Sequence, residues 1–115
     1  MSEEKINNEE QEMPQIDPKQ FEEFMKAFAK VPVMDLIIRD INEFIQKAWM
    51  NMGITLPYGE KEPTVNMEDA KLAIDCVEFL SGKLEKLISE EEYKPLQQVL
   101  ANLQINYVKK AEENK

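Results

Sequence analysis

The chain has 115 residues, no histidine and a formal net charge of -9, and charged residues make up 32% of it. So acidic a surface repels the phosphates of nucleic acids and anionic lipid headgroups, which argues against nucleic acid and membrane as partners. The length leaves room for one domain with a modest core, and the scarcity of glycine favours helices over sheets.

The first 16 residues are polar, acidic and without apolar periodicity. Such a segment buries too little apolar surface to offset the entropy of ordering, so we expect residues 1–16 to form a disordered acidic tail. The segment also lacks the basic start and apolar run of a signal peptide. Cys76 is the only cysteine, which excludes an intrachain disulfide. These features together predict a cytoplasmic protein.

A single α-helical domain is expected over residues 17–112, and its first helix is short. Asp17 can cap the helix, and Pro18 suits the first helical position because its missing N–H needs no partner there. Aromatic side chains recur on one face at Phe21, Phe24 and Phe28, and the helix should end near residues 31–32. This stripe either covers the domain's own helical hairpin or docks in a groove on another protein.

The second helix is predicted to begin at Pro32 and to end at Gly53, which can adopt the left-handed cap conformation. Its apolar face is wide. A seam of alternating three- and four-residue steps from Met34 to Ala48 is broadened by further large side chains. The broadening residues include Ile38, Ile45, Trp49 and Met52.

The third helix follows a connector of residues 53–66 and is capped by Asn66. Its predicted seam consists of Ala70, Ala73, Val77, Leu80, Leu84 and Leu87. Asp75 should face solvent or a neighbouring lysine, and Cys76 should pack as a small apolar side chain on the flank of the seam. Because glycine costs about 1 kcal/mol in a helix relative to alanine, Gly82 should have a packing reason, either a close helix crossing or a bend.

The last helix opens with a capping box at Ser89 and Glu92. Pro95, one turn later, should kink or restart this helix, because its ring removes a backbone donor and crowds the preceding turn. Together the four segments predict an all-α fold, a small bundle of three to four helices.

A resemblance to a known family rests on two segments. The run "GITLPYGEKEPTVNMEDAKLAIDCVEFLSGKL" and the later "SEEEYKPLQQVLANLQINYV" resemble the small bacterial proteins of domain-of-unknown-function family eighteen-forty-four. The similarity covers about residues 33–109. It implies a small helical fold in a bacterial cytoplasm, and it supplies no activity, cofactor or catalytic residue.

No constellation of reactive side chains supports catalysis. A nucleophilic Cys76 would need a base, commonly histidine, and the chain has none. Without histidine the Glu-x-x-His motif of diiron bundles is also excluded, and Gly82 lacks the preceding glycine of a phosphate-binding loop. We therefore expect no enzyme activity and no cofactor, metal or catalytic site.

The leading hypothesis is a small helical interaction protein that associates with itself as a homo-oligomer. Apolar surface in excess of what one hairpin buries motivates it. The predicted contacts are Ile38, Ile45, Trp49, Met52 and Phe79, with Phe21, Phe24 and Phe28 for the first helix. The alternative is a binding module that holds a small apolar ligand or a partner peptide, in the bundle interior or at the connector around Tyr58.

Overall fold

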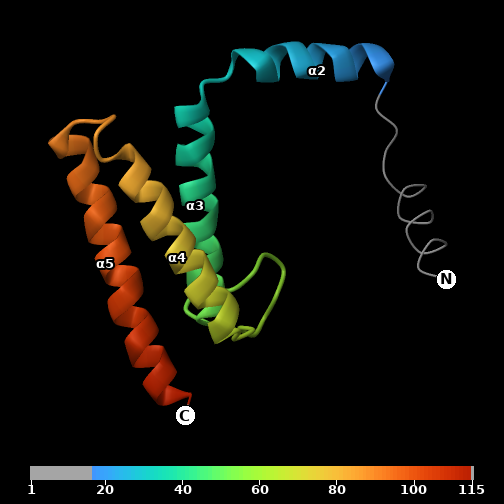
Figure 1. Cartoon of the computed structure of the whole chain (residues 1–115). Coiled ribbons are helices and arrows are strands. Elements are labelled where there is room, and N and C mark those ends of the chain that lie inside the picture. The colour runs from blue at the N-terminus through green and yellow to red at the C-terminus, as the bar shows by residue number, and fades with distance from the viewer. Residues whose placement is uncertain (1–16, 115) are drawn as a thin grey trace. The chain divides into compact units, whose positions relative to one another are not determined.

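The computed structural model describes residues 17–114, so the predicted acidic tail lies outside the described residues. Within this range the predicted all-α fold is confirmed. Residues 17–114 form four helices: α2 (Pro18–Lys30), α3 (Val33–Asn51), α4 (Met67–Leu84) and α5 (Glu90–Glu113) (Figure 1). It divides between Pro32 and Val33 into two units, of which the first contains α2 and the second contains α3, α4 and α5.

Three of the predicted helix starts are confirmed in detail, while α3 begins at Val33, one residue after the predicted Pro32. The side chains of Asp17, Asn66 and Ser89 each accept a hydrogen bond from a backbone N–H in the first turn of the helix that follows. The capping box is complete, because the Glu92 N–H donates to Ser89 Oγ at 3.1 Å and the Ser89 N–H donates to Glu92 Oε1 at 3.4 Å. Local hydrogen bonds that are readable in the sequence therefore set where each of these helices begins.

Gly53 ends α3 as predicted. Its φ of +79° is a left-handed conformation that side chains with a Cβ rarely adopt. The Gly53 N–H donates to the Met50 carbonyl at 2.9 Å, and the Ile54 N–H donates to the Trp49 carbonyl at 3.1 Å. These two bonds form a Schellman motif, which satisfies carbonyl groups at the end of the helix that would otherwise lack partners.

The connector between α3 and α4 is a loop whose two ends are tied together. The Asn66 N–H donates to the Asn51 carbonyl at 2.8 Å. Val65 passes so close to Gly53 that a Cβ at that glycine would lie 2.8 Å from Val65 Cγ2. Tyr58 lies at a turn in the middle of this loop and is fully exposed. The closed ends return the chain beside the end of α3 and so place α4 against it.

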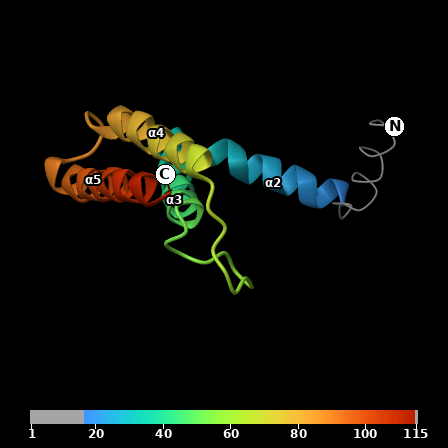
Figure 2. The ribbon, with the colours of Figure 1, turned by 90° about the horizontal axis from the view of Figure 1, so that it is seen from below.

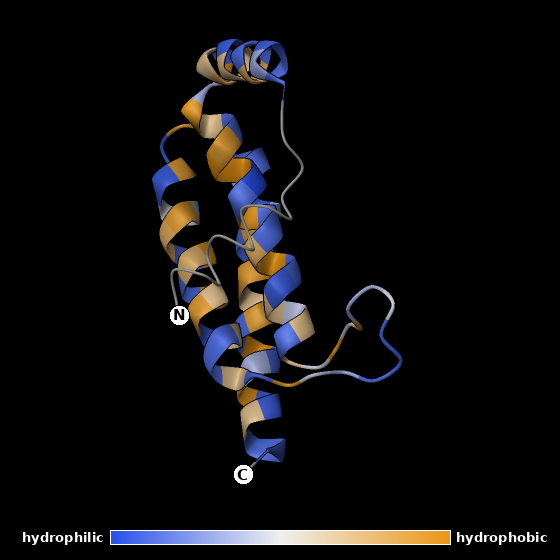
Figure 3. Cartoon of the chain, turned by 90° about the vertical axis from the view of Figure 1, so that its right-hand side faces the viewer, coloured by the Kyte–Doolittle hydropathy of each residue, from blue (hydrophilic) through white to orange (hydrophobic). Residues whose placement is uncertain are grey.

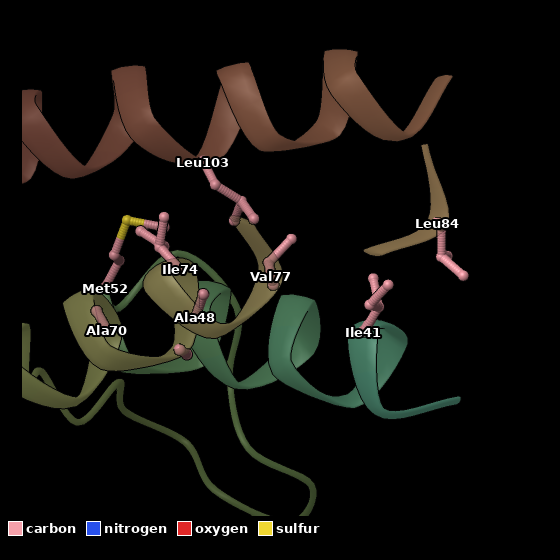
Figure 4. Packing of buried hydrophobic residues seen from close by; sticks show 9 residues of the cluster. Ile41, Ala48, Met52, Ala70, Ile74, Val77, Leu84 and Leu103 are labelled. Atoms are coloured by element: carbon pink, nitrogen blue, oxygen red, sulfur yellow. The ribbon is translucent and has the colours of Figure 1, made fainter. Parts of the chain in front are cut away.

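The core lies where α4 packs against both α3 and α5, whereas α3 and α5 contact each other little. Figure 2 shows α4 running alongside α5. Leu103 of α5 points toward the side chains of α3 and α4 (Figure 4). The core residues are Ile41, Ala48, Met52, Ala70, Ala73, Ile74, Val77, Leu84 and Leu103. Most of the predicted seam of α4 is thus buried, together with the small polar Ser81.

Three local predictions need correction. Leu87 is exposed, because α4 ends at Leu84 and the seam has no helix to continue on. No atom other than its immediate neighbours and its own helix lies within 4 Å of a Cβ built on Gly82, so no close helix crossing explains this glycine, and a bend there stays a prediction. Pro95 does not restart the last helix, since α5 continues through it from Glu90 to Glu113, and a kink at Pro95 stays a prediction.

Candidate interaction surface

The wide apolar face of α3 is divided between core and surface. Ile38 is exposed, while Ile45 and Trp49 are partly buried at the edge of the core. Met52, predicted as an interface residue, is completely buried. It follows Ala48 by four residues on the same buried stripe, so its side chain fills the core of its own chain and offers no surface to a partner.

Phe79, the predicted contact on α4, is 64% exposed. It belongs to a second apolar stripe, because Leu72, Cys76 and Phe79 follow one another at spacings of four and three residues. Leu72 is 62% exposed and Cys76 is half-buried. Leu72 and Phe79 lie away from the buried seam and Cys76 lies on its flank, so α4 has apolar residues on a second face as well.

An open cleft of about 390 Å³ borders this stripe between α4 and α3. Its apolar wall consists of Phe44, Cys76, Phe79 and Leu80, and two carboxylates lie at its rim. The rim residues are Asp40 and Asp75. The cleft extends the apolar surface of α4 onto α3.

Charged side chains surround the second stripe in a definite order. Glu68 and Asp69 lie in the first turn of α4, and Lys83 lies in its last turn. The Lys83 ammonium is 5.1 Å from the centre of the Phe79 ring, a cation–π distance. As predicted, Asp75 faces a neighbouring lysine: the Lys71 Nζ lies 4.0 Å from its Oδ2, and both side chains are largely exposed.

The aromatic stripe of α2 forms as predicted. The rings of Phe24 and Phe28 stack with their centroids 6.2 Å apart. Phe21, Phe24 and Phe28 are exposed by 44–62%, and α2 buries none of its residues. Which surface this stripe contacts stays a prediction, with the chain's own hairpin and another protein as its two candidates.

Reactive groups are sparse in the part of the chain that the structure describes. Cys76 is half-buried in the middle of α4, far from the first turn, where free N–H groups favour a thiolate. Among residues 17–114 no group of three or more Cys, Asp or Glu side chains could hold a metal ion. None of the helices described is long and apolar enough to cross a membrane.

The sequence singled out Phe79 on this surface but missed Leu72 as its partner. The missing signal is a second periodicity, since Leu72, Cys76 and Phe79 repeat at helical spacing out of phase with the buried seam. Hydrophobic and hydrophilic residues alternate along the helices of the chain (Figure 3). Two apolar stripes on one helix resemble a single wide stripe in the sequence. Periodicity identifies the residues that share a face, but it does not show whether another helix covers that face.

The comparisons with known proteins give one match. A family model described as "Domain of unknown function (DUF1844)" matches residues 34–109, which span α3, α4 and most of α5. No curated protein and no solved structure matches the chain.

Proposed function

The chain belongs to the DUF1844 family, and from this premise we propose that it is a non-catalytic protein–protein interaction module that associates with itself. The proposed setting is the bacterial cytoplasm, where a lone thiol such as Cys76 stays reduced. The proposed contacts are Ile38, Ile45, Trp49 and Phe79, without Met52.

One observation carries this proposal: large apolar side chains are exposed on every helix of the α3–α5 unit. Ile38 on α3, Leu72 and Phe79 on α4, and Ile105 and Val108 on α5 are all exposed. Scattered exposed apolar residues are ordinary, but contiguous ones tend to mark interaction sites. Leu72, Phe79 and the adjoining cleft form such a contiguous surface.

Sedimentation equilibrium of the full chain over a wide range of concentrations tests self-association. We expect the average mass to rise with concentration, and a strict monomer at the highest concentration would contradict the proposal. Phe79→Ser should weaken association, since it removes an exposed ring. Glu78→Gln on the same helix is the matched control, because it changes an exposed neighbour without removing apolar area.

The α3–α4 cleft favours a second candidate function, the binding of a small apolar ligand or a partner peptide. Its apolar wall includes Phe44 and Leu80, and polar groups lie at its edge, a composition typical of ligand sites. Native mass spectrometry after mild purification separates the two functions. A retained ligand adds a small mass to the monomer, whereas self-association doubles the monomer mass.

The absence of catalysis is part of the proposal. It is supported by the lack of histidine and by the position of Cys76 in the middle of its helix. An activity that depends on the thiol and its acidic neighbour, and is lost in Cys76→Ala and Asp75→Asn, would overturn it.

A further inference from the structure

We infer that two copies of this chain associate through the outward face of α4, antiparallel and related by a two-fold axis that passes near Cys76. This inference rests on the proposed self-association and specifies its geometry. The face, called the outer face of α4 from here on, consists of Glu68, Asp69, Leu72, Cys76, Phe79, Lys83 and Lys86.

The centre of the outer face is apolar and open. Leu72 and Phe79 are exposed and Cys76 lies between them on the same stripe. The opposite side of α4 packs against α3 and α5, which leave Leu72 and Phe79 exposed, while Cys76 is half-buried in the wall of the α3–α4 cleft. Apolar residues at alternating four- and three-residue steps are the pattern by which one helix packs against another.

Charge is ordered along the outer face. The acids Glu68 and Asp69 lie at its N-terminal end and Lys83 lies at its C-terminal end, with Lys86 in the turn that follows α4. All four side chains belong to exposed residues and are free to meet a partner. Apart from Asp75, whose carboxylate lies 4.0 Å from the Lys71 ammonium, the face therefore has acids at one end, apolar side chains in the middle and bases at the other end.

This order makes the face complementary to itself in one direction only. Asp69 precedes Cys76 by seven residues and Lys83 follows it by seven, so an antiparallel pair centred on Cys76 places Asp69 of each copy opposite Lys83 of the other. A parallel pair would place each charge opposite its like. Charges at the edge of an interface fix orientation more than they add affinity, which is the role assigned to these residues.

The same register also brings apolar side chains of the two copies into contact. Leu72 lies four residues before Cys76 and Leu80 four after it, so the antiparallel pair brings Leu72 over the Leu80 side of the α3–α4 cleft. One helix face with three apolar side chains is small for a stable interface, which usually buries about 1,200–2,000 Å² in total. A weak, concentration-dependent dimer is the expected result.

The single native thiol reports on this geometry directly. The full chain, at a concentration at which it self-associates, is treated with a short bis-maleimide, which links two thiols only when they are close. We expect a covalent dimer when the reagent is added to the native chain, and none when the chain is denatured before the reagent is added. In the control, Cys76→Ala is combined with Lys109→Cys, which moves the thiol to α5. Cross-linking of the control but not of the native chain would overturn the inference and move the interface to α5.

A charge exchange tests the register independently. Glu68→Lys with Asp69→Lys makes both ends of the face basic, and Lys83→Glu with Lys86→Glu makes both ends acidic. We expect each double variant alone to dimerise about tenfold more weakly or worse, because like charges then meet across the axis. An equimolar mixture of the two should recover dimerisation, because opposite charges meet again at both ends.

The outcomes separate this inference from the proposed function. If the native chain is a monomer at every concentration, the proposed self-association fails and the inference fails with it. If the native chain associates but Cys76 does not cross-link and the charge variants associate as the native chain does, only the geometry at α4 is overturned. If dimerisation recovers only when the two double variants are mixed, a general effect of charge on folding is excluded as the cause.

Discussion

The helices α2 and α4 look alike in sequence and differ in what covers them. Each has apolar residues at three- and four-residue spacing. Yet α4 buries six residues between its neighbours, and α2 buries none. The comparison teaches that helical spacing defines which side chains share a face, while burial requires a second surface that the chain must bring to that face.

The two faces of α4 add a lesson about side-chain size. Its buried face contains small residues at Ala70, Ala73 and Ser81, whereas its outer face exposes the large Leu72 and Phe79. Small side chains allow neighbouring helices to approach closely, so α3 and α5 both fit against one side of α4. The large side chains of the other face are left exposed by α3 and α5.

The largest expected effect comes from truncating one apolar side chain in each helix. Leu84→Ala in α4 should lower the free energy of unfolding by about 2–5 kcal/mol, because it leaves a cavity in the core. Phe24→Ala in α2 should change it by less than about 0.5 kcal/mol, as is usual for exposed sites. Urea unfolding followed by circular dichroism measures both. Equal losses would mean that the stripe of α2 is buried on its own chain and would break the comparison.

The second largest loss of stability is expected from backbone strain at the connector between α3 and α4. Gly53→Ala should cost about 1–3 kcal/mol, because φ is +79° there and Val65 must also move. Gly59→Ala is the matched control. Its φ of +83° imposes similar backbone strain, but nothing lies within 4 Å of the added Cβ. Thermal unfolding should therefore show a smaller loss at Gly59, and the reverse order would contradict the close passage of Val65.

Loss of a helix cap should also affect α4 and α2 differently. Asn66→Ala should lower the unfolding free energy of the α3–α5 unit by about 1 kcal/mol, since a cap of α4 is lost. Asp17→Ala should leave that value unchanged and speed hydrogen exchange of the amides of α2, because a helix of 13 residues without buried contacts is marginal. A loss of stability in the α3–α5 unit on Asp17→Ala would show that α2 supports that unit.

The smallest expected effect is a gain. Gly82→Ala should stabilise the α3–α5 unit by up to about 1 kcal/mol, because alanine is the better helix former and the added Cβ meets open space. The reverse change in α2, Ala29→Gly, should reduce helicity there without shifting the unfolding transition. A destabilised Gly82→Ala would indicate a role for this glycine in a contact outside the chain.

Much of the fold was predictable because its signals are local. The caps at Asp17, Asn66 and Ser89, the stop at Gly53 and the seam from Ala70 to Leu84 each follow from hydrogen bonds or spacing within a few residues. The wrong predictions concern residues whose surroundings depend on where a neighbouring helix lies. Met52 is core because α4 and α5 close over it, and Gly82 needs no crossing because no helix passes there.

The candidate surface was predictable only in part for the same reason. Phe79 was identified from its place in the helix, but the pairing of Phe79 with Leu72 on an open face depends on where α3 and α5 lie.

By itself the sequence determined the helices, their ends and the residues that share each face, because backbone hydrogen bonds and side-chain periodicity act over short distances. Only the tertiary structure decided that α3 and α5 both pack on the seam of α4 and leave its second apolar stripe uncovered, because burial is a property of two surfaces in contact. Leu72 and Phe79 are therefore exposed and Cys76 is half-buried on the face through which we propose that the chain associates.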